Sequence, residues 1–173
     1  KASPFQNRAV ITLEGDRASP VLSLGGWDVG ARTLVVGGNL SLWGMPRAAS
    51  WTALNATAAT NASTLVVDGV VDWVAGDVVV LSPTGYDPHE AETMTVVSAQ
   101  PASSGHGSGP TTVRLNGTLR YEHYAGVERR GGRHMAMQAG VGLLTRNVVI
   151  RAGNHSRFKS SEEENYGAAV RVR

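Results

Sequence analysis

The chain has no cysteine among its 173 residues, which excludes a disulfide framework and a thiolate metal site. Its stability must therefore come from burial of apolar side chains, and a chain of this length can bury a core as about one domain. No apolar run approaches the roughly 18 residues that a membrane-spanning helix requires. We also expect no signal peptide, because Lys1–Pro4 leads straight into strand-like sequence.

The chain also has little net charge, +2 at neutral pH. The sequence pI of about 9.3 reflects an excess of arginine over lysine. These arginines are scattered and interleaved with acidic residues, so they form no basic stripe of the kind that binds nucleic acid. We therefore expect no nucleic-acid partner. Membrane attachment would come only through parts of a longer protein, of which this sequence is expected to be an internal piece.

Aromatic residues are few, at 6%, whereas glycine is abundant, at 21 residues. With valine, leucine and alanine supplying most of the apolar content, this balance predicts many short strands joined by tight turns. Three stretches, 52–63, 100–112 and 160–165, do not fit strands and are expected to be exposed loops. The predicted strands are Ala9–Leu13, Val21–Leu24, Thr33–Val36, Asn39–Trp43, Thr64–Val67, Asp77–Leu81, Glu92–Val97 and Thr112–Leu115.

A β-sandwich would produce the same series of strands. Very short corners such as Gly37-Gly38, and an apparent lack of hairpin pairs, favour an all-β right-handed parallel β-helix, a solenoid with irregular loop insertions. The segment Val141–Arg151 fits this pattern as a strand, a polar corner at Arg146-Asn147 and a second strand. Gly167–Arg173 is interpreted as a later rung.

Five of the eight asparagines stand in N-glycosylation sequons, which favours a secreted, glycosylated surface. Asn and Ser/Thr also cluster in turns for structural reasons, so we do not expect every sequon to carry a glycan. The five are Asn39, Asn55, Asn61, Asn116 and Asn154.

Candidate chemistry centres on one loop that contains Asp87, His89, Glu90 and Glu92. Asp87, Glu90 and Glu92 together offer oxygen ligands for calcium. Asp87 and Glu92 are also candidate catalytic carboxylates, because glycoside hydrolysis uses a carboxyl pair roughly 5–10 Å apart. The interpretation that we favour is structural: Asp87 makes a turn and Glu92 begins a strand, with neither a catalytic nor a metal site present.

The remaining histidines and the tryptophans carry weaker signals. The spacing of His123, His134 and His155 suits no zinc site, and His106 lies in a low-complexity loop. Trp43, Trp51 and Trp73 are expected to be packing anchors rather than platforms for sugar. Gly76-Asp77, after Trp73, predicts a turn into a strand. We expect no cofactor, with calcium as the alternative.

Several segments, in order along nearly the whole chain, resemble motifs of the G8-domain family. Val141–Asn147 has the form VGLLTRN, and Trp73–Val80 fits the pattern W-x-x-G-D-x-[IV]-V. The pattern is closest to fibrocystin and fibrocystin-L, and more distant from the hyaluronidases cell migration-inducing protein and transmembrane protein 2. On this basis residues 1–127 are G8-like and residues 128–173 begin the following β-helix. Further similar segments are Phe5–Gly15, Thr33–Val36, Trp43–Pro46, Trp51–Leu54 and Tyr86–Glu92.

The resemblance implies a non-enzymatic, extracellular, glycosylated β-helix scaffold within a large cell-surface protein, of a cilium or flagellum in some relatives. Its partners would be other extracellular or ciliary-surface proteins, or its own copies. The first alternative is part of a calcium-dependent enzyme that degrades hyaluronan or another polysaccharide. In that case Arg120, Arg129, Arg130 and Arg133 would meet the polyanion. The second alternative is a carbohydrate-binding module.

Overall fold

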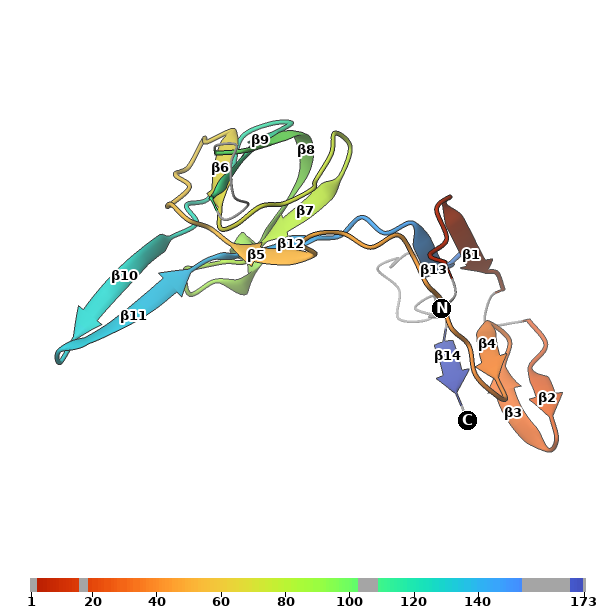
Figure 1. Cartoon of the computed structure of the whole chain (residues 1–173). Helices are drawn as coiled ribbons and strands as arrows, with labels where there is room; N and C mark the ends of the chain where they lie inside the picture. Colours follow the sequence, from red (N-terminus) through yellow and green to blue (C-terminus); the bar gives the residue numbers. More distant parts are fainter. Residues whose placement is uncertain (1–2, 16–18, 103–108, 154–168, 173) are drawn as a thin grey trace. The chain divides into compact units, whose positions relative to one another are not determined.

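A computed structural model describes residues 3–15, 19–102, 109–153 and 169–172 of the chain (Figure 1). Apart from one short 3-10 turn, η1 (Pro88–Glu90), its regular elements are β-strands, so the predicted all-β class is confirmed. The chain divides into two compact units. Unit 1 comprises Lys1–Met45 and Arg146–Arg173, and unit 2 comprises Pro46–Thr145. Unit 2 is thus inserted, in sequence, into unit 1, and the predicted division at residue 127 stays a prediction.

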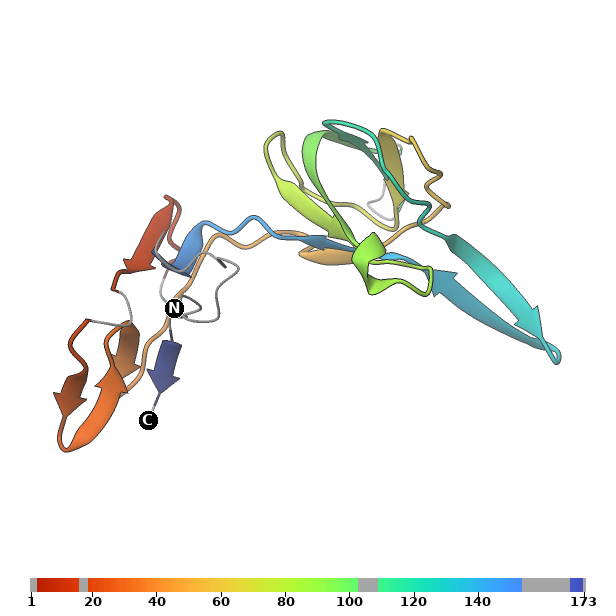
Figure 2. The ribbon, with the colours of Figure 1, turned by 180° about the vertical axis from the view of Figure 1, so that it is seen from behind.

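Unit 2 contains a six-stranded antiparallel sheet with the strand order β5-β12-β7-β8-β9-β6 (Figure 2). Its two ends approach each other through the bridge Leu54↔Val67 and the hydrogen bond from Asn55 N to Val66 O, 2.8 Å, so the sheet is nearly closed. The strands are β5 (Trp51–Ala53), β6 (Thr64–Val67), β7 (Val78–Leu81), β8 (Glu92–Pro101), β9 (Thr111–Leu115) and β12 (Gly140–Leu143).

Alternation along these strands builds the core of unit 2. In β9, for example, Thr111, Val113 and Leu115 are buried while the residues between them are exposed, because successive side chains point to opposite faces of a strand. The inward faces enclose one apolar cluster. It comprises Leu54, Ala58, Leu65, Val67, Val71, Trp73, Val79, Leu81, Val96, Val113, Leu115, Leu119, Ala139, Val141 and Leu143.

A two-stranded hairpin of unit 2, the β10–β11 arm, pairs with no strand of this sheet. It comprises β10 (Ala125–Arg130) and β11 (Arg133–Gln138), which pair only with each other in the described structure. Gly131 and Gly132 form its turn with φ of 55° and 74°, a left-handed conformation that favours glycine. The arm projects from the sheet in Figure 1, and every residue from Val127 to Gln138 is exposed.

Unit 1 consists of two parallel strand pairs and one hairpin. β1 (Ala9–Leu13) pairs in parallel with β13 (Val148–Ala152), and β4 (Thr33–Val36) pairs in parallel with β14 (Ala169–Val172). The hairpin joins β2 (Leu22–Leu24) to β3 (Trp27–Gly30) through Gly25-Gly26, again with positive φ. Two strands near the start of the chain, β1 and β4, thus each pair with a strand near its end, β13 and β14 respectively.

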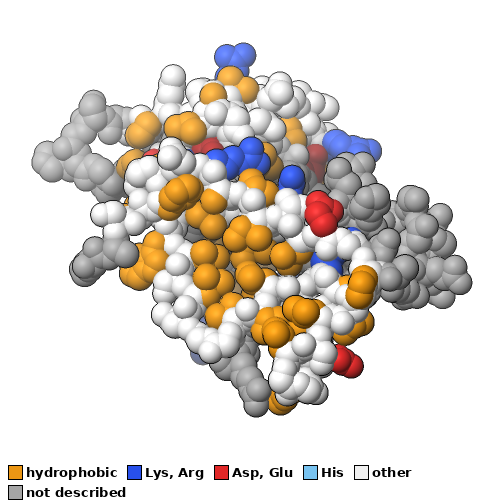
Figure 3. Space-filling view, turned by 90° about the vertical axis from the view of Figure 1, so that its right-hand side faces the viewer, with side chains coloured by type: hydrophobic (Ala, Val, Ile, Leu, Met, Phe, Trp, Pro, Cys, Tyr) orange, Lys and Arg blue, Asp and Glu red, His pale blue; other side chains and the backbone are white. Residues whose placement is uncertain are grey.

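Very few apolar side chains are buried in unit 1. Val29 is its only buried apolar side chain among the described residues, whereas many others are more than one-third exposed. Apolar side chains gather on the molecular face shown in Figure 3. The large exposed apolar residues of unit 1 are Phe5, Val10, Ile11, Val21, Leu22, Leu24, Trp27, Leu40, Leu42, Trp43, Met45 and Val170.

The parallel β-helix expected for the whole chain is wrong for unit 2, whose sheet is antiparallel. Two glycine hairpins also contradict the inferred lack of hairpin pairs. The stretch 52–63 is not a fully exposed loop, because Leu54 and Ala58 are buried. Asn39–Trp43 forms no strand. The low-complexity residues 103–108 and the acidic run 160–165 lie outside the described residues.

Candidate functional site

The predicted carboxylate loop begins with a turn that Asp87 caps. An Asp87 side-chain oxygen accepts a hydrogen bond from His89 N at 2.8 Å, and Pro88 starts η1, where its missing N–H costs nothing. Tyr86 and Asp87 are exposed, and the Glu90 side chain lies over Gly85. The turn that was favoured from the sequence is present, and its carboxylate serves its own backbone.

Glu92, at the start of β8, lies in a buried polar cluster instead. Its carboxylate accepts hydrogen bonds from Arg120 N, at 2.8 and 3.1 Å, and from Tyr121 N at 3.0 Å. It also contacts His123 Nε2 at 3.1 Å. Burial alone raises the pKa of Glu92, but the two backbone N–H groups and His123 together outweigh it, so the pKa lies below its ordinary value.

His123 is completely buried and completes this cluster. Its Nδ1 lies 2.8 Å from the carbonyl oxygen of Ser82, and its Nε2 faces the Glu92 carboxylate. Both ring nitrogens therefore lie within hydrogen-bonding distance of an oxygen atom. The result is a charge-assisted tie between β7, β8 and the segment 119–124, not a reactive group open to substrate.

The structure does not gather the candidate calcium ligands. Asp87 caps η1, Glu90 folds onto Gly85, and Glu92 is turned into the buried cluster. Within the described ranges, no group of three or more His, Cys, Asp or Glu side chains is arranged to hold a metal ion. His89 is exposed within η1, His134 lies on the β10–β11 arm, and His106 and His155 fall outside the described residues.

The W-x-x-G-D motif has a structural role that the sequence only partly suggested. Asp77 is buried and accepts from Val74 N at 2.8 Å, closing the predicted turn around Gly76, which has φ of 90°. The same carboxylate contacts the Arg47 guanidinium at 2.6 Å, and Arg47 also reaches Asp72 at 3.3 Å. Burial raises the pKa of Asp72, but its hydrogen bonds and the charge of Arg47 outweigh this effect. The pKa of Asp72 therefore lies below its ordinary value.

Only one of the three expected tryptophan anchors is an anchor. Trp73 is 3% exposed, and its indole Nε1 donates to Ala49 O at 2.8 Å. Trp43 and Trp51 are 57% and 70% exposed, so the packing role expected for them is wrong. Trp51 lies in β5, whose partner β12 presents Gly142 opposite it, so no cross-strand side chain covers the indole from that position.

Asn147, the predicted corner residue, connects three segments of unit 1. Its Oδ1 accepts from Met45 N at 2.9 Å, and its Nδ2 donates to Phe5 O at 2.6 Å and Asn7 O at 3.0 Å. A Cβ atom at Gly44 would lie 2.5 Å from this Oδ1, so glycine is required for the close approach. The amide is fully used by backbone groups, which makes Asn147 a structural residue.

The sequon asparagines Asn39, Asn55, Asn61 and Asn116 are all exposed, and Asn154 lies outside the described residues. Asn61 adopts φ of 67°, a left-handed conformation that asparagine tolerates. The Nδ2 of Asn55 donates to Asp68 at 2.7 Å, whereas that of Asn39 donates to its own sequon serine, Ser41, at 3.2 Å. Each of the four stands where a glycan would meet solvent.

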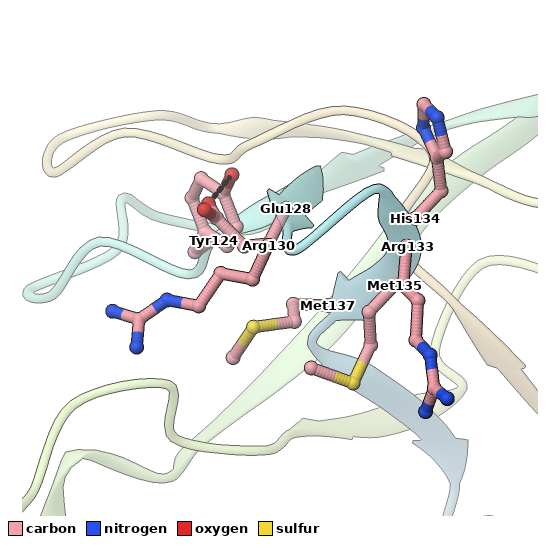
Figure 4. A pocket seen from close by; sticks show the side chains of 7 residues that line it. All are labelled: Tyr124, Glu128, Arg130, Arg133, His134, Met135 and Met137. Carbon is pink, nitrogen blue, oxygen red and sulfur yellow. Dashed lines mark hydrogen bonds between the residues drawn. The ribbon is translucent and has the colours of Figure 1, made fainter.

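An open groove lies on the β10–β11 arm (Figure 4). Three of the four arginines expected to meet a polyanion, Arg129, Arg130 and Arg133, belong to this arm. Arg120 lies elsewhere in unit 2, with its backbone N–H on Glu92. The Gly131-Gly132 pair is the feature of the sequence that could have predicted this hairpin. The groove is lined by Tyr124, Glu128, Arg130, Arg133, His134, Met135 and Met137.

Comparison with known proteins connects the chain to one group. Residues 1–55 match the family described as the G8 domain. Fibrocystin-L of Mus musculus is 38% identical over 158 residues, and fibrocystin-L of Homo sapiens is 34% identical over 162 residues; they cover 90% and 92% of this chain. The chain is a relative of the fibrocystins. Fibrocystin of Canis lupus familiaris is 36% identical over 157 residues, 86% of this chain.

These matches confirm the resemblance to fibrocystin and fibrocystin-L drawn from the motifs. The matched region is about 4% of the length of each of these fibrocystins, so the chain corresponds to a small part of such a protein. None of the helical structure within the described residues is long and apolar enough to cross a membrane.

Proposed function

We propose that this chain is a non-enzymatic, extracellular scaffold segment of a fibrocystin-like cell-surface protein. The observation that carries the proposal is the use of the candidate carboxylates: Asp87 caps a turn, and Glu92 is buried among backbone N–H groups and His123. Glu92 is thereby enclosed by protein groups, and Asp87 has a structural role in its turn. The exposed β10–β11 arm is, by contrast, available to a partner protein or to another copy.

Within this scaffold, unit 1 contributes two coils of a right-handed parallel β-helix. β1 and β4 belong to one coil, β13 and β14 to the next, and the parallel registers Ala9↔Val148 and Thr33↔Ala169 support this stacking. Right-handed connection is the strong preference for parallel strands of one sheet. Unit 2 is then a globular insertion between successive coils.

An extracellular location is supported by the four exposed sequon asparagines. The fibrocystin relationship adds the cell surface, and the ciliary or flagellar membrane is the specific location that we propose. Secretion of the chain from eukaryotic cells, followed by treatment with an endoglycosidase, should lower its apparent mass. An unchanged mass would contradict the glycosylated surface.

The enzymatic alternative is tested by incubating the purified chain with high-molecular-weight hyaluronan and calcium and following polymer length on a gel. We expect the length to stay constant. Degradation that disappears in Asp87→Asn but persists in the neighbouring variant His89→Asn would overturn the scaffold proposal. Asp87 is the better residue for this test because it is exposed, whereas a change at buried Glu92 would also disturb the fold.

A further inference from the structure

The β10–β11 arm presents one face with an unusual combination of side chains. Pairing across the two strands places Glu128 opposite Met135, Gly126 opposite Met137 and Arg130 opposite Arg133, all on the same face (Figure 4). Met135 and Met137 are 59% and 48% exposed. Methionine adapts its shape to many apolar partners, so Met135 and Met137 form an adaptable apolar surface, here called the methionine floor.

Gly126 leaves room for the Tyr124 side chain on this strand. A Cβ atom at this position would collide with the ring of Tyr124, which lies over the strand. The Tyr124 hydroxyl donates to Glu128 at 2.7 Å, and this hydrogen bond raises the pKa of Tyr124. Glu128, the single carboxylate of this face, is thus hydrogen-bonded to Tyr124. In the described structure it forms no ion pair with the arginines at the tip.

The tip of the arm concentrates positive charge. Arg130 stands directly opposite Arg133, and Arg129 directly opposite His134. Like charges in cross-strand pairs destabilise a hairpin, and a two-stranded hairpin is only marginally stable by itself. In the described structure none of the three arginines forms an ion pair. An anionic partner at this tip would relieve the repulsion.

We propose that this face of the arm docks an acidic polypeptide segment that also carries an apolar side chain. Carboxylates of the segment pair with Arg130 and Arg133, and its apolar side chain rests on Met135 and Met137. Charge complementarity selects an anion, and the methionine floor selects a polypeptide over a polysaccharide, whose surface is polar. The inference rests on the proposed scaffold function and specifies the chemistry of its partner.

The test measures binding of the whole chain to a short fluorescent peptide of alternating glutamate and leucine, by anisotropy. Arg130→Ser with Arg133→Ser should weaken binding by about tenfold or more, as expected for the loss of charge pairs at an interface. Met135→Ser with Met137→Ser should weaken it as well. Arg114→Ser, at an exposed position of β9 outside the arm, is the matched control and should bind as the original chain does. Added salt should weaken the interaction.

Two results would overturn the proposal. One is equal binding of the glutamate peptide by the Arg130→Ser, Arg133→Ser variant and the original chain. The other is preferential binding of hyaluronan, which would make the arm a polysaccharide site. Far-ultraviolet circular dichroism and an unchanged melting temperature establish that the variants are folded. Degradation of hyaluronan would refute the scaffold function itself, whereas absent degradation together with absent peptide binding would refute only this inference.

Discussion

The tetrapeptide Thr-Leu-Val-Val occurs once in each unit. Both copies form strands, but they differ in pairing direction and in burial. In unit 1 it forms β4, pairs in parallel with β14, and all four residues are half-buried. In unit 2 it forms β6, pairs antiparallel with β9, and Leu65 and Val67 are completely buried. Local sequence thus specifies the extended backbone, while pairing direction and burial come from the surrounding chain.

The same difference extends over the two units. Unit 2 holds a closed apolar cluster and a buried polar tie at Glu92 and His123. The described part of unit 1 relies on strand ladders and on the Asn147 amide, with Val29 as its buried apolar residue. We infer that unit 2 is the independently stable part, because the apolar cluster of the described structure lies in unit 2.

The largest effect should follow removal of the buried carboxylate in unit 2. Glu92→Ala leaves buried His123 Nε2 without its partner and the N–H groups of Arg120 and Tyr121 without an acceptor, so unit 2 should lose about 3–5 kcal/mol of unfolding free energy. Glu90→Ala, close by in sequence but outside the cluster, should change it by less than about 0.5 kcal/mol. Urea denaturation measures both. Equal effects would refute the polar tie.

The duplicated tetrapeptide allows a matched comparison of the two units. Leu65→Ala creates a cavity in the closed core and should cost about 2–5 kcal/mol. Leu34→Ala, at the same place in the other copy, should cost about 1 kcal/mol or less, because Leu34 is already partly exposed. Thermal unfolding of the two variants provides the measurement. A larger loss for Leu34→Ala would mean that unit 1 has a core of its own.

Strand positions were largely predictable, because β-branched runs such as Ala9–Leu13 and Thr64–Val67 are bounded by turn residues. Pairing direction was not, since alternation suits parallel and antiparallel neighbours alike. The glycine pair Gly131-Gly132 is a known turn signal, but charged residues flank it instead of the alternating apolar residues that predict strands, so the hairpin is hard to predict from the sequence.

The candidate site shows a similar limit. Asp87 and Glu92 are close in sequence and chemically alike, yet one side chain caps a surface turn and the other is buried. The partners that decide this for Glu92 lie about 30 residues further along the chain, at Arg120, Tyr121 and His123. No local pattern contains that information. The exposure of Trp43 and Trp51 is not predictable from local sequence for the same reason, because burial depends on long-range packing.

In unit 1 the corresponding test is Asn147→Ala. The substitution removes the acceptor of Met45 N and the donor to Phe5 O and Asn7 O, which should cost about 1–3 kcal/mol. Amide hydrogen exchange should speed up in β1 and β13 and stay unchanged in β7 and β8. Asn7→Ala is the control, because Asn7 contributes only its backbone carbonyl to this contact. Faster exchange in unit 2 would show that the units are not energetically separate.

The smallest effect concerns pH and belongs to unit 2. The pKa of Glu92 is lower in the folded chain than the ordinary glutamate value of about 4.3. Its contribution to stability is therefore fully present above that value and is lost as the pH falls through the folded-state pKa. Glu92→Gln should remove this part of the acid dependence, so the stability curves of the variant and the original chain should converge at low pH. Curves that stay parallel down to acid pH would mean that the Glu92 charge contributes nothing to the stability of unit 2.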